Sequence, residues 1–136
     1  MKIIYDKINT EEQHAVSTRE IKRLFKIIPK DWISKFNTVH FSNQYPENSR
    51  FDRPVILSEV SNRLMVCSRG IPAEKIIEEI LIELVQRHPS HKNLRAHYAN
   101  RLDGQQLKKI HRVIDPYLEQ YKKESQPPIR GCPSRD

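Results

Sequence analysis

The chain has 136 residues and a formal net charge of +7, with 37% hydrophobic and 30% charged residues. This length suits one domain with one core, and no apolar run approaches the roughly 20 residues that a membrane-spanning helix needs. The first residues, MKIIYDKINTEE, lack the apolar segment of a signal peptide, so we expect a cytoplasmic protein without a membrane partner. Cys67 and Cys132 are expected to be thiols, because their surroundings indicate neither a disulfide framework nor a metal knuckle.

The positive charge is concentrated in the C-terminal third. Residues 1–86 hold 13 Lys and Arg against 12 Asp and Glu, a net charge of +1, whereas residues 87–136 hold 11 against 5, a net charge of +6. Such an excess can attract nucleic acid or an acidic protein, or it can be a solvated surface without a specific partner.

An amphipathic helix is the first element that the sequence predicts. Ser17 and Glu20 form a Ser-x-x-Glu capping box, and apolar residues follow at helical spacing until Pro29 ends the helix. Asp31 is expected to cap a short continuation that buries Trp32.

The period then changes to that of β-structure. A strand is predicted from Thr38, and a polar loop follows over residues 42–54. Residues 55–68 are typical of a hairpin with a two-residue turn at Ser61 and Asn62. We therefore expect three strands in a small, mostly antiparallel sheet.

A second helix is predicted over residues 72–88, because Pro72 is tolerated in the first helical turn. At 100° per residue, Glu79, Glu83 and Gln86 are expected to point away from the core, with Ile82 as an apolar exception among them. The inward arc consists of Ala73, Ile76, Ile77, Ile80, Leu81, Leu84 and Val85.

Pro89 ends this helix, and a connection follows that Leu94, Tyr98 and Leu102 are expected to anchor. A last helix is expected to begin at the capping box of Asp103 and Gln106 and to kink or restart at Pro116. We expect one domain over residues 1–124 and a flexible tail over residues 125–136. The predicted inward residues of the last helix are Leu107, Ile110, Val113, Ile114, Tyr117, Leu118 and Tyr121.

The order of these elements resembles the core of the zincin metallopeptidases. In that family a hairpin leads into a helix that bears the motif H-E-x-x-H. Residues 55–88 are similar to this segment, and ILIELVQRH lies where the motif belongs. The resemblance implies an α+β fold with a zincin-like arrangement of the three-stranded sheet and three to four helices.

The departures from the motif argue against a zinc enzyme. Two histidines four residues apart can hold Zn²⁺, and the Glu beside the first activates the bound water. Here only Glu83 keeps its identity, while Ile82 and Gln86 occupy the ligand positions. We expect no catalytic residue, no metal and no cofactor. The resemblance implies that Ile82, Glu83 and Gln86 line a cleft.

Three histidines follow this helix: His88, His91 and His97. Pro89 interrupts the helix that would align the first two, so we interpret them as surface residues. No Ser-His-Asp or Cys-His arrangement can be argued from sequence spacing. A residual metallohydrolase would depend on His88, His91 and Glu83.

The sequence therefore favours a non-catalytic binding module or pseudo-enzyme. A protein or peptide partner would contact Ile82, Glu83 and Gln86, with an edge strand available for β-augmentation. The alternative is a nucleic-acid-binding domain, for which we expect weak binding because only Tyr98 offers an aromatic ring in the basic segment. Its candidate contacts are Arg87, Lys92, Arg95, Arg101, Lys108, Lys109 and Arg112.

Overall fold

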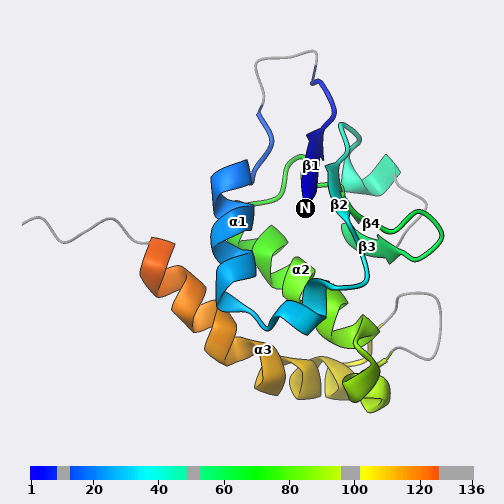
Figure 1. The fold of residues 1–136 in the computed structure, drawn as a ribbon, viewed down its shortest axis with the longest axis vertical. Helices are drawn as coiled ribbons and strands as arrows, with labels where there is room; N and C mark the ends of the chain where they lie inside the picture. Colours follow the sequence, from blue (N-terminus) through cyan, green and yellow to red (C-terminus); the bar gives the residue numbers. More distant parts are fainter. Residues whose placement is uncertain (9–12, 49–52, 96–101, 126–136) are drawn as a thin grey trace, which may run out of the picture.

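A computed structural model describes residues 1–8, 13–48, 53–95 and 102–125 (Figure 1). The strands are β1 (Lys2–Tyr5), β2 (Thr38–Phe41), β3 (Val55–Ser58) and β4 (Arg63–Val66). The α-helices are α1 (Thr18–Ile27), α2 (Ala73–Arg87) and α3 (Gly104–Ser125), and the short 3-10 helices are η1 (Lys30–Ile33), η2 (Pro46–Asn48) and η3 (Pro89–Leu94).

The sheet has four strands in the order β1-β2-β4-β3. β1 pairs with β2 and β2 pairs with β4 in parallel, and only β3 and β4 are antiparallel. The α+β class is confirmed, but the expected mostly antiparallel three-stranded sheet is wrong. β1 is absent from the sequence-based prediction, because its pairing with β2 joins segments more than 30 residues apart.

The connections explain the mixed pairing. Parallel strands need a crossover connection, and α1 supplies it between β1 and β2. The hairpin of β3 and β4 is confirmed, although its turn covers four residues, Glu59 to Asn62. Asn62 has a φ of 54°, a left-handed conformation that Asn tolerates better than most residues.

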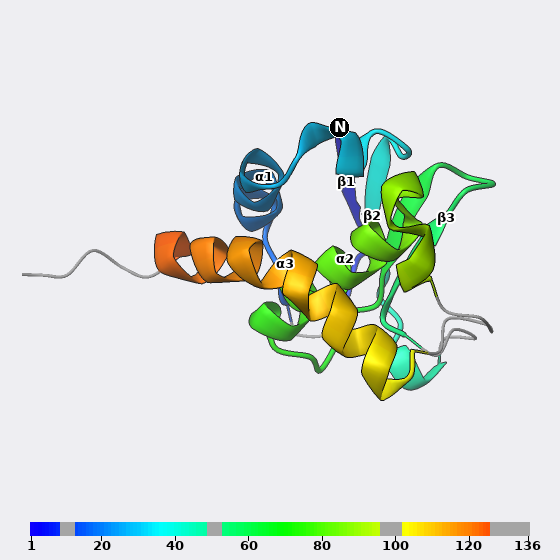
Figure 2. The same cartoon turned by 90° about the horizontal axis from the view of Figure 1, so that it is seen from below.

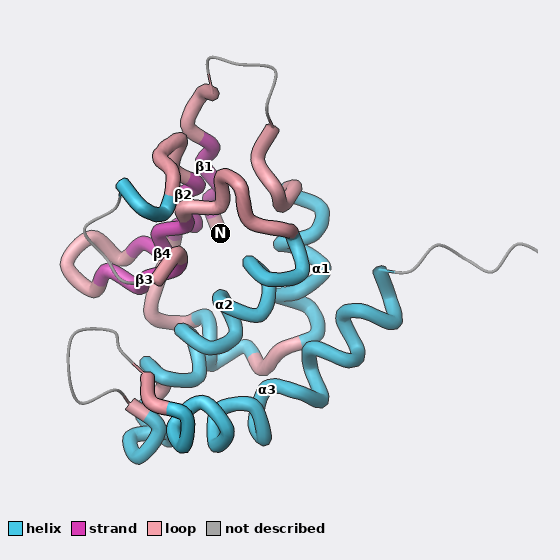
Figure 3. The backbone as a smooth tube through the Cα atoms, turned by 180° about the vertical axis from the view of Figure 1, so that it is seen from behind, coloured by secondary structure: helices cyan, strands magenta, loops and turns pink. Residues whose placement is uncertain are grey.

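The helices form two layers beside the sheet. Figure 3 shows the strands gathered on one side and α1, α2 and α3 on the other. α3 crosses the outer side of α1 and α2, as Figure 2 shows from below. Ile80 and Leu84 of α2 are 0% and 1% exposed, which confirms the predicted buried arc. None of the described helices is both long and apolar enough to cross a membrane.

Local signals placed the helix starts correctly. In α1 the Ser17 hydroxyl accepts from the Glu20 N–H, and the Glu20 carboxylate accepts from the Ser17 N–H. Asp103 and Gln106 form the same reciprocal pair before α3. Asp31, however, is not a cap, because η1 begins after Pro29 without a side-chain cap bond.

The predictions for the C-terminal third have different outcomes. α3 continues through Pro116 as one helix instead of restarting there. Leu107, expected to face inward, is 36% exposed. Leu94 is buried as predicted and Leu102 packs against the core, whereas Tyr98 lies outside the described residues. Of the predicted tail over residues 125–136, Ser125 is the last residue of α3, and residues 126–136 lie outside the described residues.

Candidate functional site

The predicted cleft face is buried. Ile82 is 2% exposed, Glu83 0% and Gln86 3%, so these residues cannot line an open cleft. α2 contacts β3 on one side and α3 on another, and a helix covered on several sides has little surface left for solvent. The 100° projection separates polar from apolar positions, but it does not reveal that the polar side is covered as well.

The carboxylate of Glu83 receives four hydrogen bonds. Oε1 accepts from Arg53 Nη1 at 3.1 Å and from Gln86 Nε2 at 3.1 Å. Oε2 accepts from the Leu57 N–H at 2.7 Å and from Arg87 Nε at 3.2 Å. Since a carboxylate offers about four lone-pair positions, Glu83 is saturated and has none left for a metal-bound water. Its position favours a structural role.

Arg53 extends this network to a second acid. Its Nε donates to Glu79 Oε1 at 3.1 Å, and its Nη2 donates to the Glu79 carbonyl at 3.2 Å. Lys75 lies 3.5 Å from the same carboxylate, and a hydrogen bond from Lys75 to Glu78 raises the pKa of Lys75. Positive and negative groups thus alternate along the side of α2, from Lys75 through Glu79 and Arg53 to Glu83. We call Arg53, Glu79, Glu83 and Arg87 the α2 charge network.

A second cluster lies where η1 meets η3. His88 Nε2 is 3.0 Å from Asp31 Oδ2, although the two residues are 57 positions apart. On the other side of the ring, the Ser90 N–H donates to His88 Nδ1 at 3.2 Å, and the Ser90 hydroxyl hydrogen-bonds to the same atom. An N–H group can only donate, so Nδ1 is the acceptor and the proton of the neutral ring lies on Nε2, facing Asp31. We call Asp31, His88 and Ser90 the Ser90 triad.

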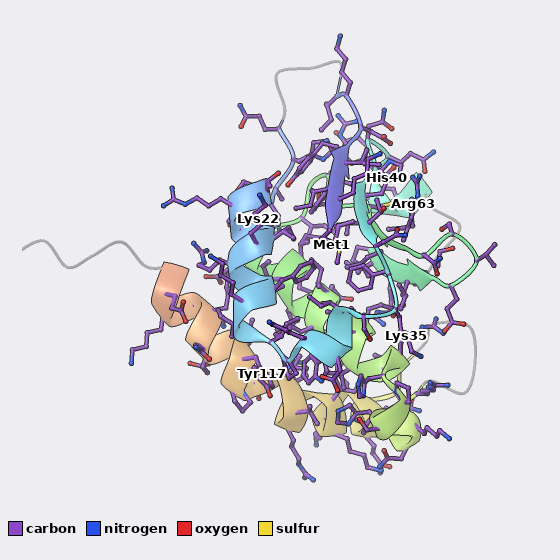
Figure 4. All side chains as sticks on the ribbon, in the orientation of Figure 1. Met1, Lys22, Lys35, His40, Arg63 and Tyr117 are labelled. Carbon is purple, nitrogen blue, oxygen red and sulfur yellow. The ribbon has the colours of Figure 1, made fainter. Side chains whose placement is uncertain are left out.

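Aromatic rings pack beside the Ser90 triad. The ring of Trp32 lies 5.0 Å from that of Tyr117 and 6.2 Å from that of His91, and the two histidine rings are 5.6 Å apart. Burial lowers the pKa of His91, and the neighbouring His88 lowers it further. Figure 4 labels Tyr117 on α3 in this part of the molecule.

This arrangement predicts a pH-dependent fluorescence signal. Trp32 is the only tryptophan, and an imidazolium beside an indole quenches its emission. We expect emission to fall on acidification, with a midpoint below the ordinary histidine pKa of about 6.5. Because the pKa of His91 is lower in the folded chain, His91 of the unfolded chain binds more protons below about pH 6.5. This group therefore lowers the free energy of unfolding as pH falls.

A fluorescence titration of three proteins tests this prediction. His91→Gln should remove or displace the transition, whereas His111→Gln should preserve it, because His111 pairs with Asp115 on α3. An unchanged transition in His91→Gln would contradict the assignment.

The described histidines do not assemble a metal centre. Nowhere in the described ranges do three His, Cys, Asp or Glu side chains gather around a point that could hold a metal ion. Glu83 belongs to the α2 charge network and His88 to the Ser90 triad. His97 lies outside the described residues.

The candidate nucleic-acid contacts separate into three groups. Arg87 is engaged by Glu83, and Arg101 lies outside the described residues. Arg95 follows η3. The Gln106 side chain donates to the Arg95 carbonyl at 2.8 Å, and this bond holds Arg95 near the start of α3. Lys108 and Arg112 border a shallow hollow of about 430 Å³ on α3. The exposed members are Lys92, Arg95, Lys108, Lys109 and Arg112, which we call the basic surface.

A third polar cluster lies on the side of β2 opposite to the buried Val39 and Phe41. His40 Nε2 is 2.7 Å from Asp6 Oδ1, and Arg63 Nη1 is 3.2 Å from His40 Nδ1. Figure 4 shows His40 and Arg63 side by side on adjacent strands. The cluster ties β1, β2 and β4 together on this face.

Comparison with known proteins returned no family model, curated protein or solved structure that matches this chain.

Proposed function

We propose that this chain is a nucleic-acid-binding domain that contacts phosphates through the basic surface. The observation that carries the proposal concerns Lys108, Lys109 and Arg112 of α3. All three are exposed, and none forms an ion pair with any described residue. Cations that are not neutralised by neighbouring acids are those whose counterions a phosphate backbone can displace.

The placement of these cations suits an extended anion. Lys108 and Arg112 are four residues apart, so they lie on the same side of α3, about 6 Å apart along its axis. The hydrogen bond between Gln106 and the Arg95 carbonyl brings η3 to the start of this helix. Lys92 and Arg95 therefore lengthen the basic surface beyond α3.

Among the described residues of α3 and η3, no tyrosine, tryptophan or phenylalanine is exposed for base stacking. Leu107 is the only large apolar side chain of α3 that reaches 36% exposure among the described residues, and it offers no ring for stacking. We therefore expect weak binding that does not depend on sequence. This type of binding is dominated by phosphate contacts and falls steeply with salt.

A pseudo-enzyme is the second candidate. The contact of Glu83 with the Leu57 N–H favours it, because the acidic residue of the zincin-like motif then lies against a strand. On this hypothesis Glu83 now stabilises the fold, and the burial of Ile82 and Gln86 leaves the former cleft without a route to a partner. The contact surface for a partner is then again the basic surface.

Salt dependence tests the nucleic-acid proposal. Each phosphate contact contributes about 0.9 to the log-log slope of affinity against salt on duplex DNA. Replacing Lys108, Lys109 and Arg112 by Ala should reduce this slope by about 3 and weaken binding to all sequences alike. Fluorescence anisotropy with labelled DNA between low and physiological salt measures the slope.

The matched control removes the same charge elsewhere. Lys22, Lys26 and Lys30 are exposed on α1 and η1, and Figure 4 shows Lys22 pointing away from the molecule. Their replacement by Ala should leave the slope nearly unchanged. Equal losses in the two triple variants would show that only net charge matters, and absence of binding at low salt would refute the proposal.

A further inference from the structure

We propose that Ser90 is a nucleophile that reacts with activated carboxylic esters, with His88 as its general base and Asp31 as a positioning residue. The inference goes beyond the proposed nucleic-acid binding and is independent of it. It rests on three side chains whose contacts follow the order nucleophile, base, carboxylate.

The hydrogen bonds give each group the role that acyl transfer requires. The Ser90 hydroxyl bonds to Nδ1, the ring atom without a proton, and Asp31 accepts from the protonated Nε2 at 3.0 Å. Either ring nitrogen of histidine can act as a base, provided that the other is held by a partner. The carboxylate of Asp31 would also stabilise the imidazolium that forms when Ser90 is deprotonated.

Helix capping does not account for the whole arrangement. The Ser90 N–H donates to His88 Nδ1, and this bond alone caps η3. It requires neither the Ser90 hydroxyl nor Asp31, which comes from a different helix. The side chain of His88 is 13% exposed while Ser90 is exposed, so the base is held in place and the nucleophile can meet a substrate.

Packed neighbours hold the triad. Trp32, next to Asp31, is 7% exposed, and Leu94, at the end of η3, is 5% exposed. Lys35 Nζ donates to the Arg87 carbonyl at 3.2 Å, which connects the segment after η1 to the end of α2. Arg95 Nη2 reaches the same carbonyl at 3.4 Å. Both cations thus bind the carbonyl of Arg87, the residue before His88.

The reaction is a two-step acyl transfer to water. Ser90 Oγ attacks the ester carbonyl carbon as its proton passes to His88 Nδ1, and the tetrahedral intermediate then expels the alcohol, which takes this proton. Water next attacks the acyl-serine and gives a proton to Nδ1, and Ser90 leaves with that proton. One ester and one water thus give one acid and one alcohol. A positioned base contributes about 10²–10⁴-fold to the rate.

A serine-directed fluorophosphonate probe tests the proposal without knowledge of the substrate. The full-length protein is incubated with the probe, and the modified residue and its rate of modification are measured by peptide mass spectrometry. We expect one adduct on Ser90 and none in Ser90→Ala. His88→Gln should reduce the rate at least 100-fold, and Asp31→Asn should reduce it about 10-fold or more.

Ser34 provides the matched control within the same protein. It is exposed, and its hydroxyl donates to the Asp31 carbonyl at 2.9 Å, so it lies near the same aspartate without an imidazole base. Ser34→Ala should react at the wild-type rate. Circular dichroism of each variant verifies the fold, and Asp31→Asn keeps the shape of an exposed side chain. The reaction of p-nitrophenyl acetate with the same variants gives the acyl-transfer rate.

A capping role for His88 alone would leave the rate of probe modification at Ser90 unchanged in His88→Gln. The proposal is overturned if the probe does not modify Ser90, if it modifies Ser34 equally fast, or if His88→Gln reacts at the wild-type rate.

Discussion

Replacing Arg53 by Ala should lower the free energy of unfolding by about 3 kcal/mol or more. Removing one partner of a buried ion pair typically costs about 3–5 kcal/mol, because the other charge remains buried without its partner. Glu83, which is 0% exposed, would keep Arg87, Gln86 and the Leu57 N–H, so we expect the lower end of this range. Denaturant unfolding followed by circular dichroism measures the change.

Two comparisons isolate the cause of this loss. Lys75→Ala removes a cation whose side chain is 53% exposed from the same side of α2, and exposed pairs contribute about 1 kcal/mol or less. The variant Arg53→Met keeps the apolar stem of the side chain and removes only its charge, so it should lose nearly as much stability as Arg53→Ala if the charge is the cause. An Arg53→Ala variant as stable as Lys75→Ala would contradict the role assigned to the α2 charge network.

Replacing Leu84 by Asp should cost about 4 kcal/mol or more, enough to unfold much of the protein. Leu84 is 1% exposed within the shared core, and a carboxylate there would lose its hydration without gaining a partner. Unfolding free energies of domains lie at about 5–15 kcal/mol, so this single change removes a large share. Thermal melting is the measurement.

The control is the same substitution at a surface leucine. Leu107→Asp on α3 introduces the same charge at a side chain that is 36% exposed, and its effect should stay within about 1 kcal/mol. Similar melting temperatures for the two variants would contradict the position of Leu84 in the core.

Short-range signals in the sequence predicted much of this fold. The capping boxes at Ser17 and Asp103 each depend on residues three positions apart, and both are formed as expected. The apolar arc of α2 follows from helical spacing alone, and its buried side is correct. Patterns of this kind involve one element at a time, which is why composition and period are sufficient to find them.

The features that were missed depend on contacts between distant segments. β1 forms a strand because β2 lies beside it, and Lys2 aligns with Thr38 far along the chain. Arg53, in a polar loop of the sequence, meets Glu83 across 30 positions. The signal in the sequence for this contact was the spacing of Glu79 and Glu83 by one helical turn. Two acids on the same side of a buried helix require a cation between them.

The Ser90 triad was missed for the same reason. His88 and Ser90 lie on either side of Pro89 in the sequence, but without Asp31 they indicate only a turn at Pro89. Asp31 was assigned a capping role that the structure does not support, because η1 starts at Lys30, two residues before the start that an N-cap at Asp31 would give. Nothing in the spacing of these residues shows that η1 and η3 meet.

The bond between Glu83 and Leu57 also limits the pairing of β3 with a strand of another chain. β3 is an edge strand with the apolar sequence Val-Ile-Leu, and unpaired N–H groups on such a strand are a template for pairing with another chain. The Leu57 N–H is occupied by a carboxylate, which has no donor to offer an incoming strand. Variants that lose Glu83 should therefore form intermolecular sheets and precipitate more readily than their loss of stability alone accounts for, with β3 as the segment that starts the aggregation.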